Sequence, residues 1–287
     1  MVEVKFFPID IDYEDYDELA IRIFGRTIDN KRVCVFDYNF KPYFWIVPKE
    51  RADMDKLIKK MKDERVDDSS VFDVEIEDKR YVGGYIKALK IIVNKPKDVP
   101  ILREALSKYT DIESINESDI LFTKRYLIDK NIVPLTAHIA SGEIINKDLD
   151  VDFCIKLDSI RQDPETFDNP RVLSFDIETY THVEQYSKED KDPIITLSFF
   201  GENFKKIITW KSFETNLDIT FVDSEASLIN EFKKTIKQHK PDYLVGYFSD
   251  GFDMPYLRAR AKKHNINLDL GLDKSRIKFN KRGILSA

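Results

Sequence analysis

The chain has 287 residues, a length that suggests about two domains. Charged residues make up 34% of the sequence and the formal net charge is -6, so a uniformly basic nucleic-acid coat is excluded and any DNA contact needs a local basic patch. Neither of the two cysteines, Cys34 and Cys154, stands in a metal-type spacing, so no zinc site is expected; a disulfide framework is not expected either, which fits a reducing cytoplasm, and no apolar run reaches the ~18 residues of a membrane span.

Residues 1–135 carry strand-like runs of β-branched and aromatic side chains, interrupted by two helical patterns. In the first helical pattern, Met54, Leu57 and Met61 recur on one face, as in an amphipathic helix. We therefore expect a mixed-sheet domain over 1–135. Its strands are predicted at Val2–Ile9, Leu19–Ile28, Arg32–Tyr38, Pro42–Val47 and Arg80–Val93, and its helices at Asp53–Met61 and Asp98–Tyr109.

Residues 136–170 differ in composition from the segments on either side. Aspartate, glutamate, asparagine and proline accumulate there, most densely in Arg161–Glu165. Such a composition is typical of loops. We therefore expect a connector over 136–170, with one strand near Val151–Leu157.

Residues 171–287 show a more regular pattern. Three strand-like runs come first, followed by a helix that Ser224 can cap, a fourth strand, and a helix opened by Pro255. This order predicts a three-stranded meander extended by a parallel strand through a helical crossover, the plan of ribonuclease-H-like nucleases. The strands are predicted at Arg171–Glu178, Ile194–Phe200, Lys206–Trp210 and Tyr243–Tyr247, and the last helix at Pro255–His264.

An acidic cluster ends the first of these strands. Residues two apart on a strand share a face, so Asp176 and Glu178 point together while Phe175 and Ile177 face the core. Two adjacent carboxylates are tolerated if a divalent cation lies between them or if one stays protonated. In the predicted topology Asp253 lands near the same strand end. Three hard oxygen donors suit Mg²⁺ or Mn²⁺ and indicate a two-metal phosphodiesterase site.

Each of these acids also has a structural interpretation. A pair of acids at a strand end is often a solvated edge, and Asp253 could simply cap the helix opened by Pro255. The four histidines lie in loops or at helix ends, and no serine or cysteine stands in a nucleophile motif. We assign no chemistry to these residues.

Several segments resemble the family B DNA polymerases. Residues 174–179, Ser-Phe-Asp-Ile-Glu-Thr, resemble the first exonuclease motif of that family, and residues 245–257 resemble the second. In the first half, residues 40–44, 98–100 and 124–129 look like archaeal members. The resemblance covers nearly the whole chain, with its motifs in the order of the family.

The resemblance implies roles for particular residues. Asp176, Glu178 and Asp253 correspond to the metal ligands of a 3'→5' proofreading exonuclease. In archaeal members a pocket of the N-terminal domain captures template uracil. Some of the residues at matching positions, namely Pro42, Tyr43 and Val99, could instead be ordinary core residues. The positions that match the pocket are Pro42, Tyr43, Pro96, Val99, Phe122 and Arg125, with Lys124 and Arg125 as holders of backbone phosphates.

The sequence departs from the family pattern at three places. Leu121 stands where a proline is usual, and Phe248 stands where the second exonuclease motif has asparagine. An aromatic ring cannot replace the hydrogen bonds of an amide. The third exonuclease motif and the palm, fingers and thumb would lie beyond Ala287. We therefore expect an N-terminal template-recognition domain over 1–135 and an incomplete ribonuclease-H-like exonuclease domain over 171–287.

Three functions follow from these observations. The first is part of a replicative polymerase, cytoplasmic and associated with the nucleoid, whose partners are template DNA, the remaining polymerase domains in the same or a second chain, and through them a sliding clamp. The second is a non-catalytic module that binds single-stranded DNA or uracil, or a subunit of a split polymerase. The third is an independent ribonuclease-H-like nuclease that recruits Asp192 or Asp273 as a fourth carboxylate.

Overall fold

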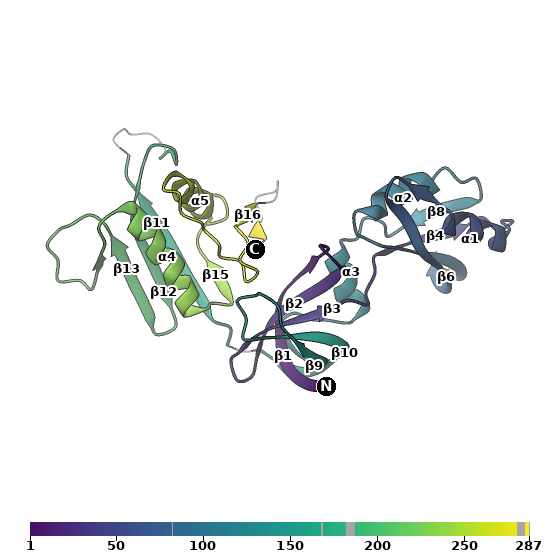
Figure 1. The fold of residues 1–287 in the computed structure, drawn as a ribbon, viewed down its shortest axis with the longest axis horizontal. Coiled ribbons are helices and arrows are strands. Elements are labelled where there is room, and N and C mark those ends of the chain that lie inside the picture. Colours follow the sequence, from purple (N-terminus) through teal and green to yellow (C-terminus); the bar gives the residue numbers. More distant parts are fainter. Residues whose placement is uncertain (82, 168, 182–186, 280–284, 287) are drawn as a thin grey trace. The chain divides into compact units, whose positions relative to one another are not determined.

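The computed structural model describes residues 1–81, 83–167, 169–181, 187–279 and 285–286 (Figure 1). The chain forms two compact units. The first comprises Met1–Asn146 and Val151–Phe167, and the second comprises Lys147–Asp150 and Asp168–Ala287. The first unit is therefore discontinuous in sequence, because a four-residue segment within it belongs to the second unit.

A closed barrel forms one part of the first unit. Its strands are β1 (Val2–Glu14), β2 (Ala20–Thr27), β3 (Arg32–Asp37), β9 (Thr136–Ile145) and β10 (Phe153–Thr166), in the order β1-β2-β3-β10-β9. All neighbours are antiparallel except β10 and β3, which run parallel. Phe6, Ile21, Val35 and Ile155 belong to its buried core.

The expected connector at 136–170 is wrong, because β9 and β10 occupy most of it. Strand β10 begins with buried residues but its second half is mostly exposed, so its polar composition resembled a loop. That half is nevertheless paired with β9 from Ser159 to Thr166. Pro164, which cannot donate to a ladder, falls at an irregularity of the register between Gln162 and Thr166.

A second sheet of the first unit lies between β3 and β9 in the sequence. It has the order β5-β6-β7-β4-β8. Leu57, Met61, Leu102 and Leu106 from two helices are buried with the apolar face of this sheet. The elements are β4 (Tyr43–Pro48), α1 (Met54–Lys62), β5 (Arg65–Val66), β6 (Ser69–Tyr81), β7 (Gly84–Val93), α2 (Asp98–Leu106) and β8 (Ile112–Asn116), followed by α3 (Phe122–Asp129).

The second unit contains a mixed five-stranded sheet of order β14-β13-β12-β11-β15. Strands β11 (Val172–Thr179), β12 (Ile194–Gly201) and β13 (Phe204–Thr209) form an antiparallel meander, and β15 (Tyr243–Val245) runs parallel to β11. The predicted meander and crossover strand are confirmed. The other elements are β14 (Thr220–Phe221), α4 (Glu225–His239), α5 (Asp253–Lys263), β16 (Lys278–Phe279) and β17 (Leu285–Ser286).

Two helices cover one face of this sheet. Helix α4 begins where the hydroxyl of Ser224 accepts a hydrogen bond from the amide of Ser227, as the capping pattern predicted. Phe175 of β11 packs against Phe232 of α4 with ring centroids 5.4 Å apart. Because Phe175 faces α4, the alternation along β11 leaves the polar residues of this strand on the opposite face of the sheet.

No helix in the described part of the chain is long and apolar enough to cross a membrane.

Candidate functional site

The carboxylate of Asp253 lies against strand β11. Strand β15 pairs with β11 only from Val172 to Ser174, so the amide of Ile177 lies beyond the last residue that β15 pairs with. Oδ1 of Asp253 accepts a hydrogen bond from this amide at 3.3 Å. Since Ile177 stands between Asp176 and Glu178, the third acid is brought to the strand segment that carries the other two.

The alternative role of Asp253 as a helix cap is wrong. The N-cap position of α5 is Phe252, which makes no capping hydrogen bond through its side chain, and Asp253 is the first helical residue. The carboxylate instead reaches across to a strand and is almost fully buried. Asp176 and Glu178, in contrast, are exposed.

The electrostatics of Asp253 reflect this placement. Burial raises the pKa of its carboxyl, and the negative charges of Asp176 and Glu178 raise the pKa further, while the hydrogen bond from Ile177 opposes them. The three acids thus repel one another. A cation at this strand end would relieve that repulsion.

The side chains are not gathered into a closed ligand set. Within the described residues, no three His, Cys, Asp or Glu side chains lie close enough together to hold a metal ion. The two acids considered as a fourth carboxylate are engaged in local turns: Asp192 accepts from the amide of Lys188 at 2.8 Å, and Asp273 accepts from the amide of Ser275 at 2.9 Å. The carboxylate oxygens of Asp176, Glu178 and Asp253 are nevertheless hard donors of the kind that Mg²⁺ or Mn²⁺ binds.

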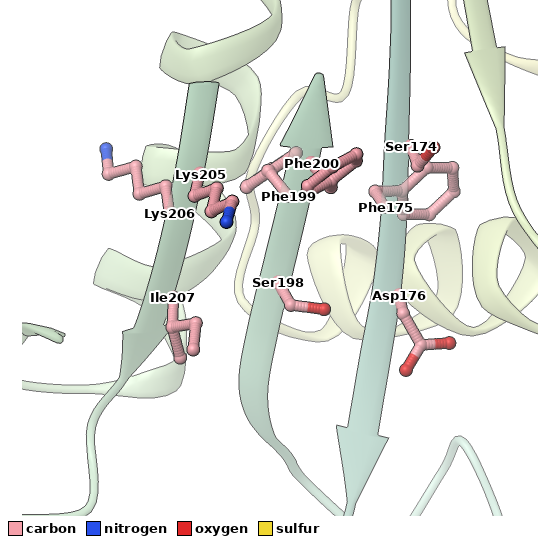
Figure 2. Close-up of a pocket in the computed structure, with 9 residues that line it drawn as sticks. All are labelled: Ser174, Phe175, Asp176, Ser198, Phe199, Phe200, Lys205, Lys206 and Ile207. Carbon is pink, nitrogen blue, oxygen red and sulfur yellow. The ribbon is translucent and has the colours of Figure 1, made fainter. Parts of the chain in front are cut away.

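Asp176 also lines an open pocket of about 320 Å³ on the uncovered face of the sheet (Figure 2). Ser198 is the cross-strand partner of Asp176 and lies in the same pocket. Next to them, the ammonium of Lys205 is 5.7 Å from the ring centroid of Phe200. The pocket is therefore mixed in character, with one carboxylate, hydroxyl groups, aromatic carbon and cations.

Three of the predicted template-binding residues come together in the first unit. The guanidinium of Arg125 lies 4.7 Å from the ring centroid of Tyr43, whose hydroxyl donates to Asp129 at 2.6 Å. Phe122 stacks on Phe40 at 5.5 Å, and Phe40 contacts Tyr43 at 6.5 Å. These contacts form one aromatic cluster at the start of β4 and along α3.

The other predicted template-binding residues lie differently. Val99 packs against the core of the sheet covered by α1 and α2, as its interpretation as a core residue predicted. Arg125 is buried and paired with Glu117 at 2.6 Å, whereas Lys124 is exposed. Of the two cations, Lys124 is thus the one open to a phosphate. Pro42 is buried and Pro96 is half-buried.

Comparison with known proteins identifies the family. Residues 113–284 match the model of the family described as DNA polymerase family B, exonuclease domain. The chain belongs to the family B DNA polymerases. The matched residues include both acidic segments, and also strands β9 and β10 and helix α3 of the first unit.

Archaeal polymerases of this family resemble the chain over nearly its full length. A DNA polymerase of Pyrococcus glycovorans is 32% identical over 281 residues, which are 97% of this chain and 32% of that protein. DNA polymerase 1 of Pyrococcus abyssi is 33% identical over 276 residues, 96% of this chain and 32% of that protein. The family B DNA polymerase of Pyrobaculum calidifontis has a solved structure with TM-score 0.82 and 25% identity, matching 98% of this chain and 35% of that one. The chain thus spans about a third of the length of these relatives.

A buried ionic network in this family B polymerase chain was missed by the sequence analysis. Glu225, the first residue of α4, accepts from Nε of Arg260 at 2.7 Å, from His264 at 2.7 Å and from the amide of Ile194 at 2.9 Å. Burial raises the pKa of Glu225, but the hydrogen bonds from Arg260 and His264 outweigh it and leave the pKa lowered. The available signal was the spacing of Arg260 and His264, which puts both on one face of a helix.

This network holds the helix that carries Asp253. Arg260 also donates to the carbonyl of Glu189 at 3.2 Å, and the hydroxyl of Tyr256 donates to the carbonyl of Asp192 at 2.8 Å. Helix α5 is thereby fastened to the segment between β11 and β12 as well as to α4. The position of Asp253 beside β11 depends on these contacts.

Proposed function

We propose that the chain is the N-terminal part of a family B DNA-directed DNA polymerase, contributing part of the 3'→5' proofreading exonuclease and a template-recognition domain to DNA replication. The observation that carries the proposal is the hydrogen bond between Asp253 and the amide of Ile177, which joins the two exonuclease-like motifs at one strand end. The meander with its helical crossover further supports a ribonuclease-H-like domain over 171–287, incomplete in these residues.

We propose that Asp176, Glu178 and Asp253 are the catalytic acids and hold Mg²⁺ or Mn²⁺. When bound, such ions activate water and stabilise the leaving 3'-oxygen of a phosphodiester. The support is the chemistry of the donors and the raised pKa of Asp253, which burial raises most and the negative charges of Asp176 and Glu178 raise further. Because the 287 residues contain no third exonuclease motif, we expect them to cleave single-stranded DNA very weakly or not at all by themselves.

Metal binding is tested by thermal unfolding of the full chain during titration with Mn²⁺. At about a hundred times its dissociation constant a ligand stabilises the folded state by about 2.7 kcal/mol, so the melting temperature of the unaltered chain should rise. Asp253→Asn should abolish the rise. The control is Asp218→Asn, which removes an exposed acid outside the site. An equal rise in all three proteins would refute the proposed metal site.

Cleavage is tested with a labelled single strand in Mg²⁺ or Mn²⁺. We expect little product from the unaltered chain and none above background from Asp176→Asn. Robust cleavage that disappears in Asp176→Asn would contradict the expectation that these residues are inactive alone, and it would establish a complete nuclease. That result would favour the independent nuclease over part of a polymerase.

We propose that the first unit recognises template DNA, with the aromatic cluster around Tyr43 as a pocket for uracil. Support comes from the contacts among Phe40, Tyr43 and Phe122 and from the exposed Lys124 next to them. Single strands that differ only in uracil against thymine should bind with different affinity. Equal affinity would remove the sensing role.

The proposed partners are single-stranded template DNA and the remaining polymerase domains, in the same or a second chain, and through them a sliding clamp. A second candidate function is a non-catalytic module that binds single-stranded DNA, because Phe248 replaces the asparagine of the second exonuclease motif. Metal binding without any cleavage in the presence of a chain carrying the missing domains would favour this candidate.

A further inference from the structure

Phe248 has a backbone conformation that is costly for its side chain. Its φ is 53°, in the left-handed region that bulky residues rarely adopt. Among the described non-glycine residues with positive φ, it is the one with an aromatic side chain. The carbonyl of Phe248 accepts from the amides of Gly251 and Phe252, at 2.9 and 3.0 Å, so a tight turn fixes this conformation.

Burial of the ring does not offset this cost. The side chain of Phe248 is 71% exposed. Its ring lies over Gly251, where a Cβ atom would come within 2.3 Å of the ring. Asparagine tolerates the left-handed region well, and it is the residue of the exonuclease motif that this segment resembles. A phenylalanine here therefore serves folding poorly.

The turn that carries Phe248 is held close to the acidic strand end. A Cβ atom on Gly246 would come within 3.0 Å of the carbonyl oxygen of Phe175, so the turn starts in direct proximity to the residue before Asp176. Its other end is Phe252, which directly precedes Asp253. Tyr247 is almost fully exposed beside Phe248. The turn thus carries two exposed aromatic rings, and both of its ends adjoin residues that precede an acid of the site.

We propose that Phe248 is a base-stacking residue that holds an unpaired base of a single DNA strand whose end reaches Asp176, Glu178 and Asp253. The inference rests on the proposed exonuclease function. The acids repel phosphates when no cation is bound, so a contact that does not depend on charge would favour binding of a strand end. Stacking meets this need, because every base has a flat face and binds an aromatic ring whatever its identity.

The test compares Phe248→Asn with Phe248→Trp in the full chain. The control is Phe213→Asn, which removes a different exposed phenylalanine, 52% exposed, in the segment after β13. The probe is a single strand about ten nucleotides long with 2-aminopurine at its 3' end, a base whose fluorescence changes when it stacks. Binding is followed by anisotropy in a buffer with a chelator, and stacking by the fluorescence of the terminal base.

The asparagine variant should weaken binding of the strand end about tenfold, the lower part of the range for one stacked base. It should also lose the fluorescence change. The tryptophan variant should keep both within about twofold, and the control should match the unaltered chain. The melting temperature of Phe248→Asn should stay the same or rise, because asparagine suits the backbone there.

The outcomes separate the stacking inference from the proposed function. Binding with equal affinity and equal fluorescence change in the unaltered chain and Phe248→Asn would overturn stacking by Phe248 and leave the exonuclease proposal intact. A clear loss of thermal stability in Phe248→Asn would overturn it as well, because the ring would then serve the fold. Failure of the unaltered chain to bind any single strand would refute the proposed function together with the inference.

Discussion

Replacing Arg260 with methionine should strongly destabilise the second unit, because it leaves a buried carboxylate without its main partner. The side chains of Arg260 and Glu225 are 4% and 6% exposed, so neither charge is well solvated in the folded chain. Breaking such a pair from one side costs about 3–5 kcal/mol. Glu225 would keep the bonds from Ile194 and His264, so we expect the lower value. For a unit of this size that is roughly a 12 °C fall in melting temperature.

The assay is thermal unfolding of matched variants. Lys234→Met is the control, since Lys234 pairs with Glu231 on the exposed surface of the same helix that Glu225 begins. An exposed pair of this kind contributes about 0.5 kcal/mol or less, or about 2 °C. Adding Glu225→Gln to Arg260→Met should cost less than the sum of the two single changes. A fall for Arg260→Met no larger than for Lys234→Met would show that the buried pair does not stabilise the second unit.

Two further changes have expected outcomes near the acidic strand end. Because the pKa of Asp253 is raised in the folded chain, its carboxyl favours folding at pH values below its unfolded pKa, and this contribution is lost as pH rises through the folded pKa. Asp253→Asn should therefore raise the melting temperature of the metal-free chain at pH 7. It should also flatten the pH dependence of the melting temperature at acid pH. No difference between the pH profiles of the two proteins would contradict this. Gly246→Ala should lower the melting temperature, because the new methyl group would meet the carbonyl of Phe175 at 3.0 Å and Cβ of Ser249 at 2.8 Å. Unchanged stability together with an unchanged response to Mn²⁺ would show that the turn can move away from β11 without consequence.

Local patterns in the sequence were enough to predict the meander, the crossover strand and the capped helix of the second unit. The alternation around Asp176 and the capping serine at 224 depend on neighbours within a few residues, and both recur in the structure. The approach of Asp253 to β11 followed from the predicted parallel strand, because a crossover connection returns the chain to the same sheet. The family resemblance added the expected chemistry of the acids, and the match to the family model shows the family itself.

Other features depend on contacts that no local pattern announces. Strand β10 is held by its ladder with β9 and not by burial, so its sequence resembled a loop. Glu225 finds Arg260 and His264, 35 and 39 residues further along, only when α4 and α5 pack together. The turn at Phe248 was noticed as a departure from a motif, but its left-handed backbone could not be inferred from the residue.

The closing strand of the barrel has a consequence for the order in which the chain acquires structure. Cys34 of β3 lies opposite Cys154 of β10 in the parallel strand register, and the whole sheet with α1 and α2 is encoded between these two residues. During synthesis the sheet of β4 to β8, with α1 and α2, is therefore complete before strands β9 and β10 of the barrel have been made. Contacts of such long sequence separation form slowly. Pulsed hydrogen exchange should accordingly protect the amides of β6 and β7 before the amides that bond β3 to β10, and the barrel should close after the inserted sheet has formed.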